Sequence, residues 1–275
     1  VTFTVTNGLL AVLADVTNGL ASGAILGNGT STVTLTGTTA QINATLAASA
    51  GLTYTPTANY NGSATLSMTT SDGTRSDTDS IVMSVTAVND APVVATVDIA
   101  GAVTELLTAS GNLTDSGTIA FSDVDIADVH SVSAVTPPAG ALGTLSVSKT
   151  TDTTGSGTGG LLTWNYSVAA SAVEYLAQGQ TKVESFTFSV SDGQGGIVSR
   201  TVDVTITGTN DAPVIDVIAG TTDVVGAITE DASSPLTDTG TLTFDDVDLI
   251  DTHSVTAIKA SGTLGGSLVL GAVIE

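Results

Sequence analysis

The chain has 275 residues, and its 27 Asp and Glu against 5 Lys and Arg give a formal net charge of −22 at pH 7. This charge excludes the basic surface that a nucleic-acid partner requires, and it disfavours binding to an anionic membrane surface. The absence of cysteine excludes disulfides, thiolate metal sites and a cysteine nucleophile, and no apolar stretch approaches the roughly 20 residues of a membrane span.

The first unit is expected at residues 1–90, as short strands with one short helix. Val1, Phe3 and Val5 alternate with threonines, and Asn7-Gly8 predicts a tight hairpin turn. A threonine cap followed by apolar residues four apart predicts a helix near residue 42. Because the sequence begins inside a strand pattern, we expect this unit to be truncated at its N-terminus. Further strands are predicted at residues 32–36, 51–55, 64–69 and 80–88.

The second unit, residues 91–211, is expected to be complete and to hold the main core. Val173, Leu176 and Ala177 lie at helical spacing and predict a second short helix over residues 169–177. Strands are predicted at residues 118–122, 131–135, 144–148, 161–168, 184–191 and 197–207. Large residues that alternate along two of these strands should form the core: Leu162, Trp164, Tyr166, Val168, Phe186, Phe188 and Val190.

The third unit, residues 212–275, repeats part of the second. The segment that begins at Thr114 returns at Thr237, 123 residues later, and a repeat of this length indicates whole domains in tandem. The sequence ends before any counterpart of the Trp164 or Phe186 strand. We therefore expect an incomplete sheet with an open edge, which favours pairing with another chain.

The five residues Asn-Asp-Ala-Pro-Val occur twice, at residues 89–93 and 210–214, each time after a predicted final strand. Proline cannot donate a hydrogen bond to a β-ladder, and it favours an extended conformation in the residue before it. We interpret both copies as joints between domains. Their Asn and Asp place polar oxygens at each joint.

These joints, together with Phe186-Thr-Phe-Ser-Val-Ser-Asp-Gly and the Phe-x-Asp-Val-Asp segments, resemble VCBS-type repeats of large RTX-type bacterial surface adhesins. The segment that begins Leu52-Thr-Tyr-Thr-Pro resembles the related bacterial cadherin-like domain. The resemblance covers nearly the whole chain. It implies an all-β fold of tandem Ig-like or cadherin-like β-sandwiches joined end to end, each with at most a short helix. It also implies calcium at the joints, export, and a role as an extender or adhesive region.

The acidic residues themselves also indicate calcium, which prefers six to eight oxygen ligands in adaptable geometry. Residues two apart on an extended segment point to one side, as Asp123 and Asp125 do. By analogy with cadherins, the linker residues Asn and Asp would meet an early Glu and an Asp-x-Asp of the next domain. The first predicted set contains Asn89, Asp90, Glu105, Asp123 and Asp125, with Asp128 just beyond. The second contains Asn210, Asp211, Glu230, Asp246 and Asp248, with Asp251 just beyond.

Other motifs favour structural roles. The Gly-rich residues 155–160 precede a strand where a dinucleotide site needs a helix, so we interpret them as a mobile hairpin loop. His130 and His253 occupy matching positions after the acidic segments, where a hydrogen-bonding role is favoured over metal binding or pH sensing. Asp72 and Asp192 are predicted to make turn hydrogen bonds. No nucleophile elbow is present, so we expect no enzyme, although the number of carboxylates alone does not exclude a glycosidase pair.

The sequence thus predicts a structural, calcium-rigidified extender segment of a secreted bacterial cell-surface adhesin that serves cell adhesion or biofilm attachment. Its expected partners are neighbouring repeats of the same polypeptide. Two alternatives stay open. One is a carbohydrate- or protein-binding module for surface glycans, which needs an exposed aromatic platform; Trp164 and Tyr166 are the candidates, although at least Trp164 should be core. The other is a self-assembling filament or surface-layer subunit with homotypic contacts. Nucleic acid and membrane insertion are not expected.

Overall fold

A computed structural model of the protein describes residues 1–275 apart from 217–221, 223–224, 231–235, 258–266 and 275. The chain divides into an N-terminal unit, Val1–Asp90, and a C-terminal unit, Ala91–Glu275, and each is described by itself. Strands dominate both units, so the predicted all-β class is confirmed. In the described residues, no helix is long and apolar enough to cross a membrane.

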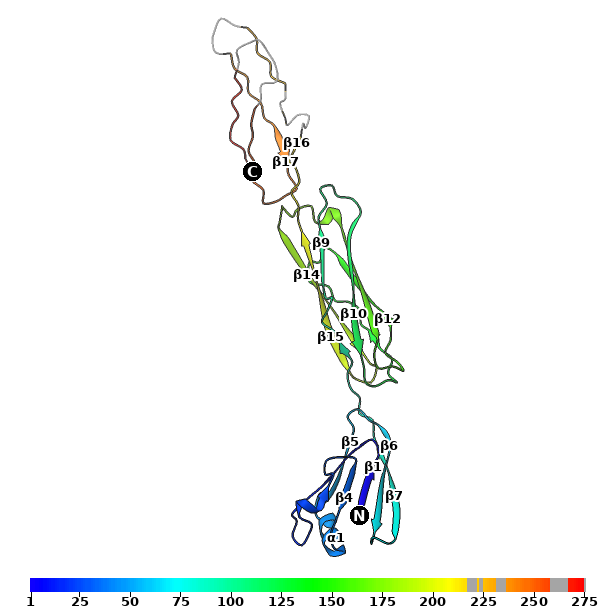
Figure 1. Cartoon of the computed structure of the whole chain (residues 1–275). Helices are drawn as coiled ribbons and strands as arrows, with labels where there is room; N and C mark the ends of the chain where they lie inside the picture. Colours follow the sequence, from blue (N-terminus) through cyan, green and yellow to red (C-terminus); the bar gives the residue numbers. More distant parts are fainter. Residues whose placement is uncertain (217–221, 223–224, 231–235, 258–266, 275) are drawn as a thin grey trace. The chain divides into compact units, whose positions relative to one another are not determined.

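The N-terminal unit packs a five-stranded sheet, ordered β3-β4-β1-β6-β7, against the two-stranded sheet β2-β5 (Figure 1). Phe3, Leu10, Val33 and Leu35 are among the buried residues between them. The strands are β1 Thr2–Val5, β2 Gly8–Val12, β3 Ile25–Leu26, β4 Thr32–Leu35, β5 Leu52–Pro56, β6 Gly62–Ser71 and β7 Ser76–Val85; a 3₁₀ turn, η1, spans Ser22–Ala24.

The predicted helix of this unit forms as α1, Thr39–Ala47. Thr38 caps it, because its side chain accepts a hydrogen bond from the Gln41 backbone while the Gln41 side chain accepts from the Thr38 backbone. The prediction of a hairpin turn at Asn7-Gly8 is wrong. β1 and β2 pair with strands of different sheets, so the chain crosses between layers there.

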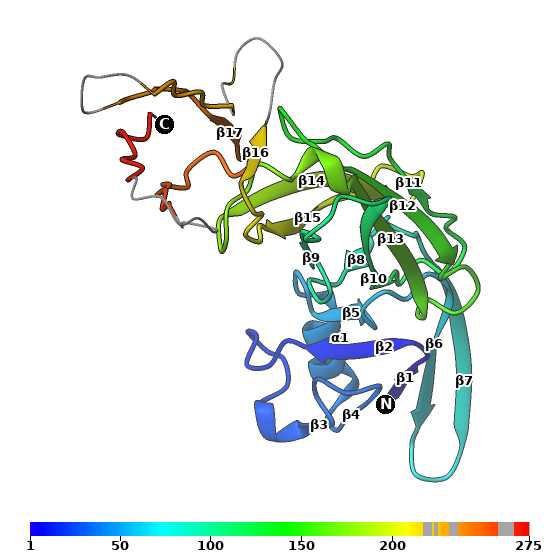
Figure 2. The same cartoon turned by 90° about the horizontal axis from the view of Figure 1, so that it is seen from above.

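Two four-stranded sheets form the body of the C-terminal unit, ordered β12-β13-β10-β8 and β11-β14-β15-β9. Figure 2 shows their strands from above. Strand β15 spans the predicted residues 197–207, whereas β8 and β9 were not predicted. The strands are β8 Val93–Val94, β9 Ala100–Thr104, β10 Asn112–Ser122, β11 Ser131–Val132, β12 Thr144–Thr151, β13 Gly160–Ala169, β14 Thr181–Ser191 and β15 Ile197–Thr207.

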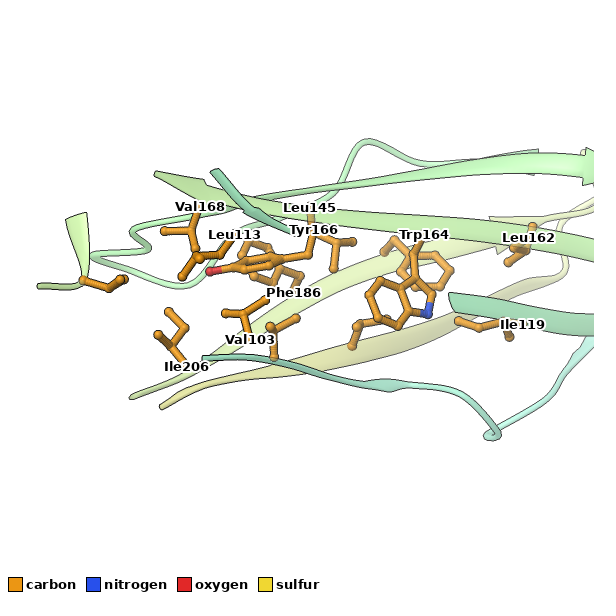
Figure 3. Packing of buried hydrophobic residues seen from close by; sticks show 14 of the residues in the cluster. Val103, Leu113, Ile119, Leu145, Leu162, Trp164, Tyr166, Val168, Phe186 and Ile206 are labelled. Atoms are coloured by element: carbon orange, nitrogen blue, oxygen red, sulfur yellow. The ribbon is translucent and has the colours of Figure 1, made fainter. Parts of the chain in front are cut away.

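The predicted core of this unit is confirmed. Leu162, Trp164, Tyr166, Val168, Phe186, Phe188 and Val190 are all buried. Figure 3 shows Val168, Tyr166, Trp164 and Leu162 in a row along β13, with Phe186 below Tyr166. The Trp164 ring donates its Nε1 hydrogen to the carbonyl of Asp98 at 2.8 Å. Its polar atom is therefore satisfied inside the sandwich.

Two features of this unit were not predicted correctly. Residues 170–172 form only a 3₁₀ turn, η2 Ala170–Ala172, although Val173, Leu176 and Ala177 are buried as expected. Strand β9 pairs in parallel with β15, from Ala100 opposite Asp203 to Thr104 opposite Thr207. The residue after β9 therefore lies at the end of the sandwich where β15 also finishes.

The described residues after Asp211 include a two-stranded sheet of β16, Val214–Asp216, and β17, Thr243–Asp245. Their pairing repeats that of β8 and β10, because Ile215 faces Phe244 as Val94 faces Phe121. The repeat seen in the sequence therefore extends to strand pairing. The predicted division of the C-terminal unit after Asp211, and the predicted open edge, stay predictions.

Candidate metal centres

Three carboxylates gather in the loop that follows β10. Asp123, Asp125 and Asp128, here named the Asp123 group, each offer an oxygen within 4.8 Å of the others. The Asp125 amide donates to Asp123 Oδ1 at 2.9 Å, and the Asp128 amide donates to the Asp125 carbonyl at 3.0 Å. Asp128 is 8% exposed, and its buried Oδ2 has no hydrogen-bond partner among the described residues. A buried anionic oxygen without a partner is costly, and a cation would remove that cost.

The Gly-rich loop between β12 and β13 holds the backbone of this acidic loop. Gly155 donates its amide to the Ile126 carbonyl at 2.6 Å, and the Gly157 carbonyl accepts from the Asp123 amide at 3.0 Å. The Thr154 hydroxyl donates to the Asp128 carbonyl at 2.6 Å. The hairpin that residues 155–160 were predicted to form is confirmed, with Gly160 already in β13, whereas its mobility stays a prediction. Its hydrogen bonds fix the positions from which the carboxylates project.

Substituting Gly157 should therefore disturb the acidic loop. Gly157 has φ +72°, and an added Cβ would lie 2.8 Å from the Asp123 carbonyl oxygen. Gly159 has a similar φ of +77° but open space around it, so Gly159→Ala is the matched control. We expect Gly157→Ala to destabilise the protein by about 1–3 kcal/mol more than Gly159→Ala, measured by denaturant unfolding. Equal losses would mean that the close approach is unimportant.

A second group lies at the other end of the sandwich. Glu105, Glu174 and Asp211, here named the Glu105 group, also offer oxygens within 4.8 Å of one another. Glu105 Oε2 accepts from the Thr209 amide at 2.8 Å, and Asp248 Oδ2 accepts from the Asp211 amide at 2.8 Å. The group thus draws on the segments after β9, η2 and β15, and Asp248, after β17, is bonded to one of its members.

Several buried oxygens around this group lack a hydrogen-bond partner among the described residues. Glu105 is 3% exposed and Asp248 is 2% exposed, so neither carboxylate can rely on bulk water. Five buried oxygens in and around the group have no partner in the part of the chain that the structure describes, and carboxylate and hydroxyl oxygens are ligands of the kind that calcium binds. They are Glu105 Oε1, Glu174 Oε1, Thr209 Oγ1, Asp211 Oδ2 and Asp248 Oδ1.

The placement of Glu105 corrects the predicted first set. We had expected Glu105 to join Asp123 and Asp125, but β10, with 11 residues, separates the two ends by roughly 35 Å. The cause is the parallel pairing of β9 with β15, which carries Glu105 to Thr209 and Asp211. Assigning Glu105 to the same site as Asp123 was wrong.

The outcomes for the other predicted residues differ. Asp211 and Asp248 are brought together as predicted. Glu230 is exposed, and its place in this site stays a prediction. The Asn210 side chain donates to the Asp211 carbonyl at 2.5 Å. Asp251 donates its amide to the Asp248 carbonyl at 3.2 Å, as Asp128 does to Asp125. A contact of Asn89 and Asp90 with the Asp123 group stays a prediction.

Glu174 and Thr209 were missed by the sequence analysis. Glu174 lies in the segment 169–177, which we predicted as a helix, and no neighbouring residue marks it as a ligand. Thr209 lies inside the second joint, directly before Asn210, and the joint motif could have indicated it.

Burial and repulsion between neighbouring carboxylates raise the pKa values in the Glu105 group. The pKa of Glu105 is raised by its burial and then by the charges of Glu174, Asp211 and Asp248. The pKa values of Glu174 and Asp211 are also raised by burial, and next by neighbouring carboxylates. Burial, followed by Asp125 and Asp123, likewise raises the pKa of Asp128. A bound cation would act against all of these shifts.

The two histidines make the predicted hydrogen bonds. His130 Nε2 lies 3.0 Å from Asp123 Oδ2, and its Nδ1 lies 2.8 Å from Asp152 Oδ1. Burial lowers the pKa of His130, but the hydrogen bonds to the two carboxylates outweigh burial and raise it overall. Asp152 also accepts from Lys149; the hydrogen bonds from Lys149 and His130 overcome its burial and lower the pKa of Asp152 to about 2.

These shifts predict the pH dependence of stability without divalent cations. For a carboxyl whose folded pKa is raised, the folded state binds more protons than the unfolded state between the two pKa values, so stability falls as pH rises through that window. We therefore expect the free energy of unfolding in chelator to increase from pH 7 to about pH 5, with His130 acting in the same direction, and to decrease again towards about pH 2 as Asp152 is protonated. Thermal unfolding over this range checks it; a monotonic loss on acidification would contradict it.

The turn hydrogen bonds predicted for Asp72 and Asp192 are confirmed. Asp72 Oδ1 accepts from the amides of Thr74 and Arg75, both at 2.8 Å, and Asp192 Oδ1 accepts from Gln194, Gly195 and Gly196. Both aspartates therefore stabilise the turns that connect paired strands.

The sequence matches no protein-family model and no curated protein. Among solved structures, domains 4 and 5 of the S-layer protein SbsC align over 57% of this chain and 69% of their own, at 18% identity and a TM-score of 0.24. The longer SbsC structure rSbsC(31-844) aligns over 88% of this chain but 28% of its own, at 15% identity and 0.25. Human CDH23 EC21-23 aligns over 90% of this chain and 68% of its own, at 15% identity and 0.30.

Proposed function

We propose that the protein is a structural module in which calcium stiffens the junction between consecutive β-domains. The observation that carries this proposal is the Glu105 group. Carboxylates from three separate segments converge there, and Asp248, from a fourth, accepts a hydrogen bond from the Asp211 amide. Buried oxygens of Glu105, Glu174, Asp211 and Asp248 have no hydrogen-bond partner among the described residues. Such an arrangement is unfavourable in a metal-free protein and favourable with a divalent cation.

The chemistry of the ligands favours calcium over other cations. The set is all oxygen, without cysteine, and the nearby His253 is bonded through Nε2 to Asp246 at 2.9 Å. Hard oxygen ligands of this kind suit calcium, and extracellular modules bind it with Kd values of roughly 10⁻⁴–10⁻³ M. Glu105, Glu174, Asp211 and Asp248 would hold the ion, and Thr209 offers a neutral oxygen.

The proposed mechanism is mechanical. Without the ion, like charges repel one another across the junction between β15 and β17, and the joint is loose. With the ion, the same carboxylates become ligands, and the sandwich and the segment after Asp211 are held together. The Asp123 group would bind a second ion at the other end of the sandwich.

A calcium titration of the full chain tests this proposal. We expect heat of binding by calorimetry, and a stabilisation of about 2.7 kcal/mol at calcium concentrations near 100 times Kd. Asp211→Ala should remove one class of sites, whereas Asp79→Ala, at an exposed position of β7, should not. If small-angle scattering and the unfolding midpoint are the same in calcium and in chelator, the proposal is wrong.

We further propose a place on a bacterial cell surface, as an extender segment of an RTX-type adhesin that serves cell adhesion or biofilm attachment, with no enzymatic activity. The VCBS-like and cadherin-like motifs of the sequence support this. Secretion would also expose both groups to the calcium they need. Neighbouring repeats of the same polypeptide would be the immediate partners.

The two alternatives receive different support. A carbohydrate-binding module needs an exposed aromatic platform, but Trp164 and Tyr166 are each 1% exposed, so the proposed platform is absent. Self-assembly into filaments or a surface layer rests on the predicted open edge after residue 212. Analytical ultracentrifugation of the full chain in calcium distinguishes self-assembly from the monomeric extender.

A further inference from the structure

His130 is fully buried beside the Asp123 group, and it is not itself placed to bind an ion. Its ring packs edge-on against Phe121, with centroids 5.1 Å apart. Nε2 faces Asp123 Oδ2 at 3.0 Å and Nδ1 faces Asp152 Oδ1 at 2.8 Å. Both ring nitrogens are therefore engaged with carboxylate oxygens, so neither offers a free lone pair to a metal.

The contact fixes the orientation of the Asp123 carboxylate. Oδ1 accepts from the Asp125 amide at 2.9 Å, and Oδ2 accepts from His130. With one hydrogen bond at each oxygen, the plane of the carboxylate is set before any ion arrives. Each carboxylate oxygen has a second lone pair, so the ability of Asp123 to bind an ion is retained.

The same arrangement recurs 123 residues later. His253 Nε2 lies 2.9 Å from Asp246 Oδ2, and the Asp248 amide donates to Asp246 Oδ1 at 3.0 Å. The His253 ring packs on Phe244, with centroids 4.9 Å apart. In each of the two acidic loops, a histidine is hydrogen-bonded to the first aspartate. This recurrence indicates that the histidine serves the acidic loop and does not only fill space in the core.

We propose that His130 is a positioning residue for the cation site of the Asp123 group, and that Asp152, on the loop after β12, holds the ring in place for this task. Partners of metal-binding carboxylates commonly tune affinity by fixing ligand orientation. His253 does the same for Asp246. This inference rests on the proposed function, because it requires that the Asp123 group binds calcium.

The test uses the full chain with Asp211→Ala as the parent, so that binding at the Glu105 group is removed. His130→Phe keeps a ring against Phe121 but removes both hydrogen bonds. We expect its calcium affinity by calorimetry to fall by about 10–100-fold relative to the parent. His130→Gln, which can still donate to Asp123, should recover part of the loss. Asp79→Ala, at an exposed position of β7, is the control and should leave this affinity unchanged.

A second measurement covers the case in which His130→Phe does not fold. The chain has only two histidines, so imidazole NMR signals can be assigned by comparison with His253→Phe. In the Asp211→Ala parent, we expect calcium chloride to shift the His130 signals. The positioning role would be overturned if a folded His130→Phe variant had unchanged calcium affinity. It would also be overturned if the His130 signals did not shift at saturating calcium. Absence of binding in both the wild type and the parent would instead refute the proposed function, and this inference with it.

Discussion

Replacing Glu105 by Gln is expected to change calcium affinity and metal-free stability in opposite directions. Affinity should fall by at least about 10-fold, because a ligand charge is lost. The protein in chelator should become more stable, because burial and three neighbouring carboxylates raise the pKa of Glu105 and make its charged form unfavourable. The amide oxygen of Gln can still accept from Thr209, so the hydrogen bond is retained.

Glu184→Gln is the matched control, because Glu184 is the other fully buried glutamate of the sandwich. It is 1% exposed, and its carboxylate accepts from Leu142, Gly143 and the Tyr166 hydroxyl. Both carboxylate oxygens of Glu184 accept hydrogen bonds, so the substitution should destabilise the protein by about 1–3 kcal/mol and leave calcium affinity unchanged. Calorimetry and chemical denaturation in chelator measure both quantities. Destabilisation by both substitutions would mean that Glu105 is a structural hydrogen-bonding residue and not a ligand.

Leu162→Ala is expected to cost about 2–5 kcal/mol of folding free energy. Leu162 is fully buried between the sheets of the C-terminal unit, beside Trp164 (Figure 3), and its removal leaves a cavity that the rigid strands cannot close. Leu161→Ala, one residue earlier on the partly buried outer face of β13, should cost less than about 1 kcal/mol. The only tryptophan is retained in both variants, so its fluorescence reports unfolding of this unit. Equal losses would contradict the assignment of the two faces.

Alternation of side chains determined how much of the fold the sequence could predict. Along β13 and β14 the large residues recur every second position, so both the strands and the buried face were predictable. Strand β9 has the sequence Ala-Gly-Ala-Val-Thr, with one large apolar residue, and its parallel pairing depends on contacts about 100 residues away. The segment 170–177 has helical spacing, but packing against the sandwich end keeps it as a 3₁₀ turn and an irregular stretch.

The sequence could predict that the candidate sites consist of carboxylates, but it could not predict correctly which residues form each site. Asp123, Asp125 and Asp128 are close in sequence, so their convergence needs only one loop. The Glu105 group depends on which strand lies beside β15, and spacing along the chain does not carry that information. Glu105 was therefore assigned to the wrong end of its own domain, and Glu174 was not found at all.

The parallel pairing of β9 with β15 also determines how the sandwich responds to tension. Strand β9 lies near the start of the domain and β15 at its finish, and they run in the same direction over five paired residues. A pull on residues 91 and 211 in opposite directions slides these strands along each other, so all the hydrogen bonds between them are loaded together instead of opening one by one. A module strung in a chain that anchors a cell would thereby resist stretching, and single-molecule pulling of the full chain measures the force at which this domain yields.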